Sequence, residues 1–181
     1  MDINSDYIVW IDMEMTGLDP IKNKILELAC LVTDSNLKIV SNEFHVIIHQ
    51  SDDELNGMDE WCTNHHEKSG LTDASKKSTI KNSEAELELL KFLQKYIPKR
   101  KCPLAGNSIY MDRTFLMTQM PLVNEYLHYR IIDVSSMKEL IRRWNPSIYE
   151  DSPKKLLKHR ALDDIKDSIR ELEYYKRHIF Q

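Results

Sequence analysis

The chain has 181 residues, of which 41% are hydrophobic and 30% are charged, as in a globular protein with one substantial core. Its formal net charge is −4, whereas proteins that track along a long nucleic acid usually present a basic surface. We therefore expect one domain over residues 1–181, and any nucleic-acid substrate should be short and held by a few specific contacts.

Several classes of protein are disfavoured by what the sequence lacks. The 4 glycines form neither a dinucleotide-binding pattern nor a P-loop, and no apolar stretch is long enough to span a membrane, so we expect no membrane partner. The 3 cysteines include no C-x-x-C pair and predict reduced thiols. Cys62 with His65 and His66 resembles part of a zinc site, but no second cluster completes four ligands.

The first third of the chain is rich in predicted strands. Three apolar segments predict strands at Tyr7–Asp12, Ile25–Thr33 and Phe44–His49. Turn residues separate these three segments: Gly17, Asp19 and Pro20 lie between the first and the second, and residues 34–36 lie between the second and the third.

Helical patterns dominate after residue 80. Leu87, Leu90, Leu93 and Ile97 recur every three or four residues and predict a helix over Ser83–Ile97, capped by Ser83 and stopped by Pro98. Further along, the patterns predict a strand at 103–106, a helix at 115–120 and a strand at 131–133. A helix face then follows, made of Val134, Met137, Leu140, Ile141 and Trp144, and the last helix begins at about Ala161. This order predicts a three-layer α/β fold with a mixed sheet, although it leaves several topologies open.

Asp12 and Glu14 follow the apolar run at residues 7–11. In a strand, residues two apart project from the same face, so these two carboxylates would lie close together. Their repulsion and burial are costly unless a cation neutralises them. Taken alone, however, such a pair is more often a solvated strand end than a metal site.

Two further acidic residues strengthen the metal interpretation. Asp112 follows the strand predicted at 103–106, and Asp164 lies in the last helix, which His159 precedes. Asp163 and Asp164 point about 100° apart on a helix, so at most one faces a shared site, and periodicity does not select Asp164. Four carboxylates suit hard cations, and two such ions can promote phosphoryl transfer. A histidine can accept the proton of the attacking water.

Three groups of residues resemble the three motifs of the DEDD exonucleases, in their histidine subclass: Asp12-x-Glu14-x-Thr16-Gly17-Leu18, Gly106-Asn-Ser108 with Asp112, and His159-x-Ala161-x-x-Asp164. Outside these motifs, segments over roughly residues 7–180 resemble oligoribonucleases, with details closer to the animal form than to the bacterial one. The resemblance implies a ribonuclease H-like fold, a single exonuclease domain, two Mg²⁺ or Mn²⁺ ions, and 3′→5′ removal of nucleotides from very short RNAs, especially dinucleotides. It also implies that Asp12, Glu14, Asp112 and Asp164 hold the ions and that His159 is the general base.

The resemblance further implies that Leu18 and Trp61 wedge against the bases. Without it, Leu18 would be taken as a turn anchor in the core, whereas the acidic neighbours of Trp61 make a core position improbable. Stacking on such a surface contributes roughly 1–3 kcal/mol per base and tolerates any base.

Ser108, Arg130, Ser135 and Ser136 are candidates for binding the 5′ phosphate of the substrate. Ser135 and Ser136 open a predicted helix, whose N-terminus is a natural anion site. A capping box from Ser136 to Glu139 would explain them by capping alone, but both roles can coexist. In the family that the chain resembles, Tyr129 and Arg130 reach the neighbouring subunit's site, which implies a homodimer. A closed phosphate pocket would also reject long substrates.

Two alternative functions share much of this pattern. A proofreading-type 3′→5′ DNA exonuclease would have the same five catalytic residues, but the net charge and Trp61, Tyr129 and Arg130 count against it. An inactive binding module would normally lack at least one metal carboxylate, and none is missing here. The expected compartment is the cytoplasm or the mitochondrion, because relatives work in both and the N-terminal residues show no presequence.

Overall fold

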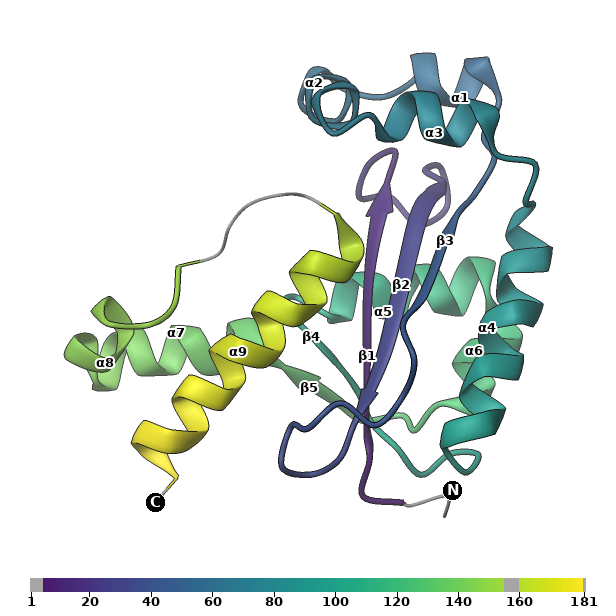
Figure 1. Cartoon of the computed structure of the whole chain (residues 1–181). Helices are drawn as coiled ribbons and strands as arrows, with labels where there is room; N and C mark the ends of the chain where they lie inside the picture. The colour runs from purple at the N-terminus through teal and green to yellow at the C-terminus, as the bar shows by residue number, and fades with distance from the viewer. Residues whose placement is uncertain (1–4, 155–159, 181) are drawn as a thin grey trace.

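The computed structural model describes residues 5–154 and 160–180. At its centre lies a mixed five-stranded sheet with the strand order β3-β2-β1-β4-β5 (Figure 1). The first three strands form an antiparallel meander, β4 pairs in parallel with β1, and β5 pairs in parallel with β4. Their bounds are β1 Ile8–Met15, β2 Ile25–Thr33, β3 Phe44–Ile47, β4 Leu104–Gly106 and β5 Ile131–Asp133. The sheet confirms the predicted α/β class and settles the topology that segment order had left open.

Helices cover both faces of this sheet and so complete three layers (Figure 1). One face carries α4 (Asn82–Tyr96), α5 (Tyr110–Gln119) and α6 (Pro121–Tyr126). The opposite face carries α7 (Val134–Trp144) and α9 (Ala161–Ile179), and the short α8 (Pro146–Glu150) follows α7. None of the described helices is both long and apolar enough to cross a membrane.

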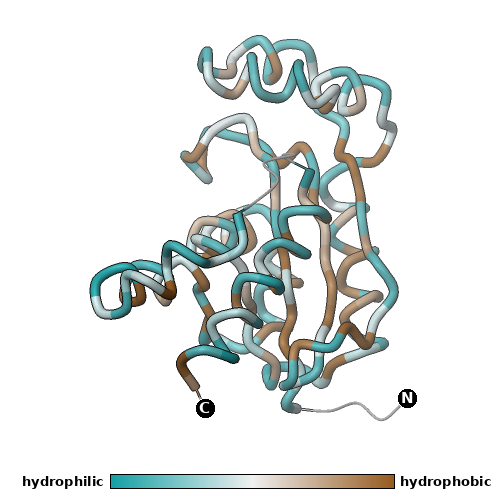
Figure 2. The backbone as a smooth tube through the Cα atoms, turned by 60° about the vertical axis from the view of Figure 1, so that its left-hand side comes forward, coloured by the Kyte–Doolittle hydropathy of each residue, from teal (hydrophilic) through white to brown (hydrophobic). Residues whose placement is uncertain are grey.

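The alternation of side chains along β1 determines where its acidic residues point. Val9, Ile11 and Met13 belong to the core under α4, whereas Trp10 belongs to the core under α9. Since every second residue of a strand shares a face, Asp12 and Glu14 continue the row of Trp10 toward α9. Hydrophobic segments accordingly run along the central strands, while the helices alternate between hydrophobic and hydrophilic residues (Figure 2).

Three short helices, not predicted from the sequence, lie over one end of β1 and β2 (Figure 1). They are α1 (Asp52–Asn56), α2 (Glu60–Lys68) and α3 (Leu71–Lys77). They enclose a small apolar cluster of their own with β2, made of Leu26, Leu55, Met58, Cys62 and Leu71. Helices of this length contain too few turns for an apolar period to be recognised.

Several details of the predicted helices were wrong. Ser83 is not a cap, because α4 begins at Asn82 and the Glu84 carboxylate accepts a hydrogen bond from the Lys81 N–H at 2.8 Å. Leu87 is exposed, and the buried stripe of α4 runs through residues 85, 89 and 93 instead. Leu140 and Trp144 of α7 are also exposed. The helix predicted at 115–120 begins at Tyr110, and this earlier start places Asp112 in its first turn.

Candidate active site

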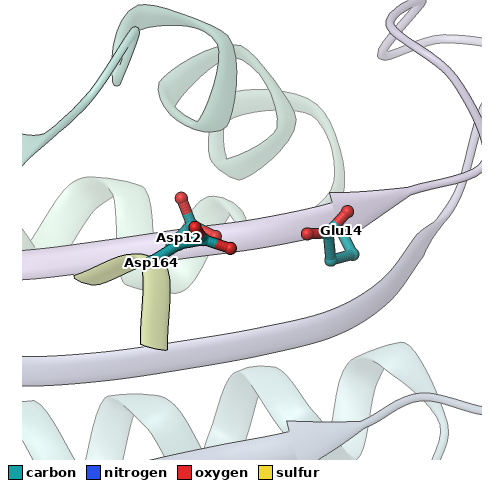
Figure 3. A group of neighbouring side chains, drawn as sticks. All are labelled: Asp12, Glu14 and Asp164. Carbon is teal, nitrogen blue, oxygen red and sulfur yellow. The ribbon is translucent and has the colours of Figure 1, made fainter. Parts of the chain in front are cut away.

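Asp12 and Glu14 of β1 meet Asp164 of α9. Each of the three offers a carboxylate oxygen that lies within 4.8 Å of those of the other two (Figure 3). Asp164 reaches this point because α9 begins at Ala161 and packs on the face of β1 from which the two strand carboxylates project. Of the two adjacent acids in α9, Asp164 and not Asp163 therefore belongs to this acidic group.

Asp112 approaches the same strand from the other side of the sheet. The residue is 6% exposed, and its carboxyl group receives a hydrogen bond from the backbone of Met13, the residue between Asp12 and Glu14. Burial raises the pKa of Asp112 to about 7, and the charge of Asp133 adds to the shift, although the hydrogen bonds from its own backbone and from Met13 oppose it. Asp112 lies outside the close group of three, yet its charge acts on Glu14.

The Glu14 carboxyl group has a strongly raised pKa. Burial, together with the charges of Asp164, Glu27 and Asp112, raises its pKa to about 8, and the positive charge of Arg160 only partly compensates. Arg160 therefore offsets only part of the negative charge around Glu14. Hard oxygen donors that repel each other in this way fit a divalent cation, which would neutralise them.

A second group of charged side chains, which was not identified from the sequence, lies next to the acidic centre. Glu27 of β2 is the register partner of Glu14 and is fully buried, and its Oε1 accepts a hydrogen bond from Arg160 Nε at 3.1 Å. His45 Nε2 lies 2.5 Å from the same oxygen. Burial opposes ionisation of Glu27, but the His45 hydrogen bond and the Arg160 charge outweigh it and lower the pKa of Glu27. A lone acid within an otherwise apolar strand was the signal available in the sequence.

His159, the expected general base, lies outside the described residues. Its role therefore stays a prediction. The adjacent Arg160, which is described, links the beginning of α9 to Glu27 and so to the strand opposite Glu14.

A pocket of about 390 Å³ adjoins the acidic centre. Glu14, Leu18, Trp61 and His66 are among the residues that line it, so Glu14 belongs to both the pocket and the acidic group. Leu18 is 68% exposed and Trp61 is 63% exposed, which excludes the core position considered for Leu18. His66 Nε2 lies 2.9 Å from the Met15 carbonyl oxygen and joins α2 to the end of β1.

The zinc alternative gains no support from this region. Cys62 packs in the apolar cluster under α1–α3, and His66 is engaged with Met15. Within residues 5–154 and 160–180, the group of side chains close enough to share a metal is the acidic one.

His65 supports the exposed indole ring of Trp61. The two rings stack with centroids 4.5 Å apart and planes 8° apart, one helical turn from each other on α2. We expect His65→Ala to raise KM for a dinucleotide about threefold to tenfold with little change in kcat, because the indole loses its support. His65→Phe should restore KM. Steady-state kinetics on both variants test this, and an unchanged KM for His65→Ala would contradict a contribution of the stacked pair to substrate binding.

Ser108 and Ser135 come together between β4 and α7. Ser108 has a left-handed backbone with φ of 51°, held by hydrogen bonds from its N–H to Asp133 Oδ1 at 3.1 Å and to Ser135 Oγ at 3.0 Å. The two serine Oγ atoms are 3.3 Å apart. Ser136 follows in the first turn of α7 and is exposed, so the structure gathers these three candidate phosphate ligands.

The expected capping of α7 was wrong. Asp133 is the N-cap and accepts hydrogen bonds from the N–H groups of Ser135 and Ser136 at 2.9 and 3.4 Å. Glu139 pairs with Arg142 and Arg143 instead of closing a capping box. The first N–H groups of α7 are consequently engaged by a carboxylate, which leaves the serine hydroxyls as the groups available to an anion.

Tyr129 and Arg130 lie apart from these serines along the chain. Both are exposed and directly precede β5, the edge strand, whereas Ser135 follows it. A strand of three residues spans about 10 Å, so the two groups stand at opposite ends of β5. The Arg130 guanidinium lies 5.5 Å from the centre of the Tyr129 ring.

The fold and the acidic centre define the class of protein. Residues 9–172 match the model of the exonuclease family RNase_T. The ribonuclease H-like fold is shared with exonuclease I of E. coli, solved with an oligonucleotide, at a TM-score of 0.75 and 14% identity, over 97% of this chain and 42% of that one. The chain spans about two fifths of the length of the exonuclease I chains it matches.

Closer relatives narrow the family. The mitochondrial oligoribonuclease of Homo sapiens is 53% identical over 96% of this chain and 73% of its own length. The oligoribonuclease of Pseudoalteromonas atlantica is 51% identical over 99% of both chains, and the probable oligoribonuclease of Drosophila melanogaster is 52% identical over 96% and 82%. The chain belongs to the oligoribonuclease family of exonucleases.

Proposed function

We propose that this protein is a 3′→5′ exoribonuclease that hydrolyses very short RNAs, above all dinucleotides, to nucleoside 5′-monophosphates. One observation carries the proposal: Glu14 belongs both to the acidic centre and to the pocket that Leu18 and Trp61 line. A phosphodiester between two bases held at that pocket would thus lie beside the carboxylates. Relatives named oligoribonucleases and the match to the exonuclease family support the same activity.

The proposed reaction uses two divalent cations, Mg²⁺ or Mn²⁺, held by Asp12, Glu14, Asp112 and Asp164. When bound, such ions promote ionisation of water and stabilise charge that develops on the phosphoryl oxygens. The carboxylates fix the position of this chemistry, and His159 is proposed to accept the proton of the attacking water. Leu18 and Trp61 hold the bases by apolar contact, which requires no particular base sequence.

The 5′ phosphate of the substrate is proposed to bind at Ser108, Ser135 and Ser136. Asp133 engages the nearest backbone N–H groups, so hydroxyl groups and an arginine would provide the hydrogen bonds to this phosphate. This arrangement limits the room for a longer strand at the 5′ end. It therefore agrees with a preference for dinucleotides and with the absence of an overall basic charge.

The proposed arginine is Arg130, supplied with Tyr129 by a second copy of the chain in a homodimer. Exposed apolar side chains near the β5 edge and on α7 support such an interface: Tyr129, Ile131, Leu140 and Trp144. A twofold interface would bring the start of one β5 strand to the other protomer.

Mixing two inactive variants tests whether Arg130 acts across this interface. The Arg130→Ala variant alone should lose activity on both dinucleotides to different extents. The loss should be about tenfold greater for the 5′-phosphorylated dinucleotide than for the one without the phosphate. When Arg130→Ala and Asp112→Asn protomers are dissociated and reassembled together, about a quarter of the sites should be intact. Activity should then return to about a quarter of the wild-type value, measured on the phosphorylated dinucleotide. If mixed dimers form but activity does not return, Arg130 acts in the site of its own subunit.

The proposed function is tested by a time course on 5′-phosphorylated RNAs from two to about ten nucleotides long, with Mg²⁺ and with EDTA. We expect the dinucleotide to be cleaved fastest, with rates that fall with length and vanish in EDTA. Trimming of long strands with the dinucleotide left intact would favour the proofreading-type alternative. Binding without cleavage under either metal would favour the inactive module.

The proposed compartment is the cytoplasm or the mitochondrion, and one domain over residues 1–181 is proposed to carry the activity. Mitochondrial oligoribonucleases of mammals and oligoribonucleases of bacteria are both among the relatives. Cys30, Cys62 and Cys102 are buried and form no disulfide, as in a reducing compartment. Imaging of the endogenous tagged protein tests the location, and accumulation in secretory compartments would contradict it.

A further inference from the structure

A partly buried hydrogen-bond network centred on Asn107 joins the two halves of the proposed site. Asn107 directly follows β4, where the strand lies against α7 and α9 (Figure 1). Its Oδ1 lies 2.5 Å from Ser168 Oγ, and its Nδ2 donates to Glu171 Oε2 at 3.1 Å and to Ser135 Oγ at 3.3 Å. Ser168 Oγ also lies 2.8 Å from the backbone oxygen of Asp164.

Glu171 fixes which way the Asn107 amide points. This carboxylate is 1% exposed, and a buried carboxylate is tolerated only when its oxygens are well paired. Its Oε1 accepts hydrogen bonds from Tyr175 Oη and Lys138 Nζ, each at 2.9 Å, so Oε2 is the oxygen that faces Asn107. Because a carboxylate accepts but does not donate, the NH₂ group of Asn107 must face it.

The orientation of the Asn107 amide also determines what the Ser135 hydroxyl can do. Ser135 Oγ receives hydrogen bonds from Asn107 Nδ2 and from the Ser108 backbone N–H, and the Ser108 hydroxyl also donates to it at 3.3 Å. A hydroxyl oxygen has two acceptor sites and one proton to donate. Because both acceptor sites are used, the Ser135 hydroxyl can interact with a further group only as a hydrogen-bond donor. The oxygens of a phosphate monoester accept hydrogen bonds, so such a donor suits them.

We propose that Asn107 and Glu171 are positioning residues for the 5′ phosphate of the substrate. They hold Ser135 as a hydrogen-bond donor and tie it, through Ser168, to the helix turn that carries Asp164. Neither residue touches the substrate. Their effect is to favour RNA ends that bear a 5′ phosphate, so this inference rests on the proposed 5′-phosphate site.

The experiment compares the dissociation constants of a dinucleotide with and without a 5′ phosphate, measured by calorimetry in EDTA so that no cleavage occurs. The proteins are the wild type, Asn107→Ala, Glu171→Gln and Tyr175→Phe. The last is a matched control, because it removes a hydrogen bond from the Glu171 oxygen that faces away from Asn107. Thermal unfolding establishes that each variant folds, and Glu171→Gln preserves the size of the side chain should Asn107→Ala fail to fold.

The wild type should bind the phosphorylated dinucleotide at least about tenfold more tightly than the other one. Asn107→Ala and Glu171→Gln should reduce this ratio about fivefold, with the unphosphorylated ligand bound as in the wild type, and Tyr175→Phe should keep the ratio. Equal losses for both ligands, or an unchanged ratio in the folded variants, would overturn the positioning role. A wild type without preference would instead reject the 5′-phosphate site itself.

Discussion

Asp112→Asn is expected to abolish metal-dependent hydrolysis without unfolding the protein. The side chain is buried and its carboxyl has a pKa of about 7, so an amide of the same shape removes a poorly tolerated charge. The amide oxygen still accepts the hydrogen bond from the Met13 backbone, whereas the affinity for a divalent cation falls with the lost charge. We expect kcat to fall on the order of a thousandfold, about 4 kcal/mol, with an equal or higher melting temperature in EDTA.

Asp163→Asn provides the matched control for this variant. Asp163 is adjacent to Asp164 but does not belong to the acidic group, so its replacement should leave kcat close to the wild-type value. Steady-state rates on a dinucleotide with Mg²⁺, together with thermal unfolding, measure both variants. If Asp112→Asn kept a tenth of the activity, Asp112 would have to be removed from the proposed catalytic set.

Without metal, the protein is expected to become less stable as the pH rises from 4.5 to about 8. Folding raises the pKa of Glu14 from 4.5 to about 8, mainly through burial and the charge of Asp164. The folded state thus binds a proton more tightly than the unfolded state, so its stability is fully present below pH 4.5 and is lost up to pH 8. The loss in free energy of unfolding should be on the order of 2–4 kcal/mol.

A divalent cation should reverse this loss, because it takes the place of the protons. Addition of Mg²⁺ or Mn²⁺ should raise the melting temperature strongly near pH 8 and little near pH 5, where protons already occupy the carboxylates. Glu27 acts in the opposite sense at lower pH, since its lowered pKa contributes stability that disappears on acidification. Glu14→Gln should weaken the dependence between pH 5 and 8 in EDTA and leave the part that comes from Asp112, whose pKa burial raises to about 7. A stability that rises with pH in the metal-free wild type would contradict the assignment to Glu14.

Short-range geometry made much of the acidic centre predictable. The alternation of a strand placed Asp12 and Glu14 on one face, and β1 does carry both residues on the face toward α9. For Asp164, periodicity left the choice open, and the resemblance to a known motif selected the residue that the structure brings to the group. The roles of these residues in metal binding and catalysis stay predictions.

The interactions that escaped prediction depend on pairings between distant segments. Glu27 faces Glu14 only because of the register between β1 and β2, and Arg160 reaches Glu27 across more than a hundred residues of sequence. Asp133 likewise displaced the expected capping box because its carboxylate turns toward the first N–H groups of α7. A linear pattern contains propensities and periods, but it does not contain the register of a sheet.

One side of the pocket belongs to a part of the molecule that packs separately from most of the acidic centre, although Glu14 and Leu18 line the other side. Trp61 and His66 lie on α2, within the three short helices that share an apolar cluster with β2, whereas the carboxylates come from β1, α5 and α9. Substitutions in residues 51–78 can therefore accumulate with little disturbance of the acids. If Trp61 contacts the bases as proposed, this segment could change the contacts to the substrate while the acidic residues stay the same. Chimeras of the segment between related exonucleases should then inherit the substrate preference of the segment's donor.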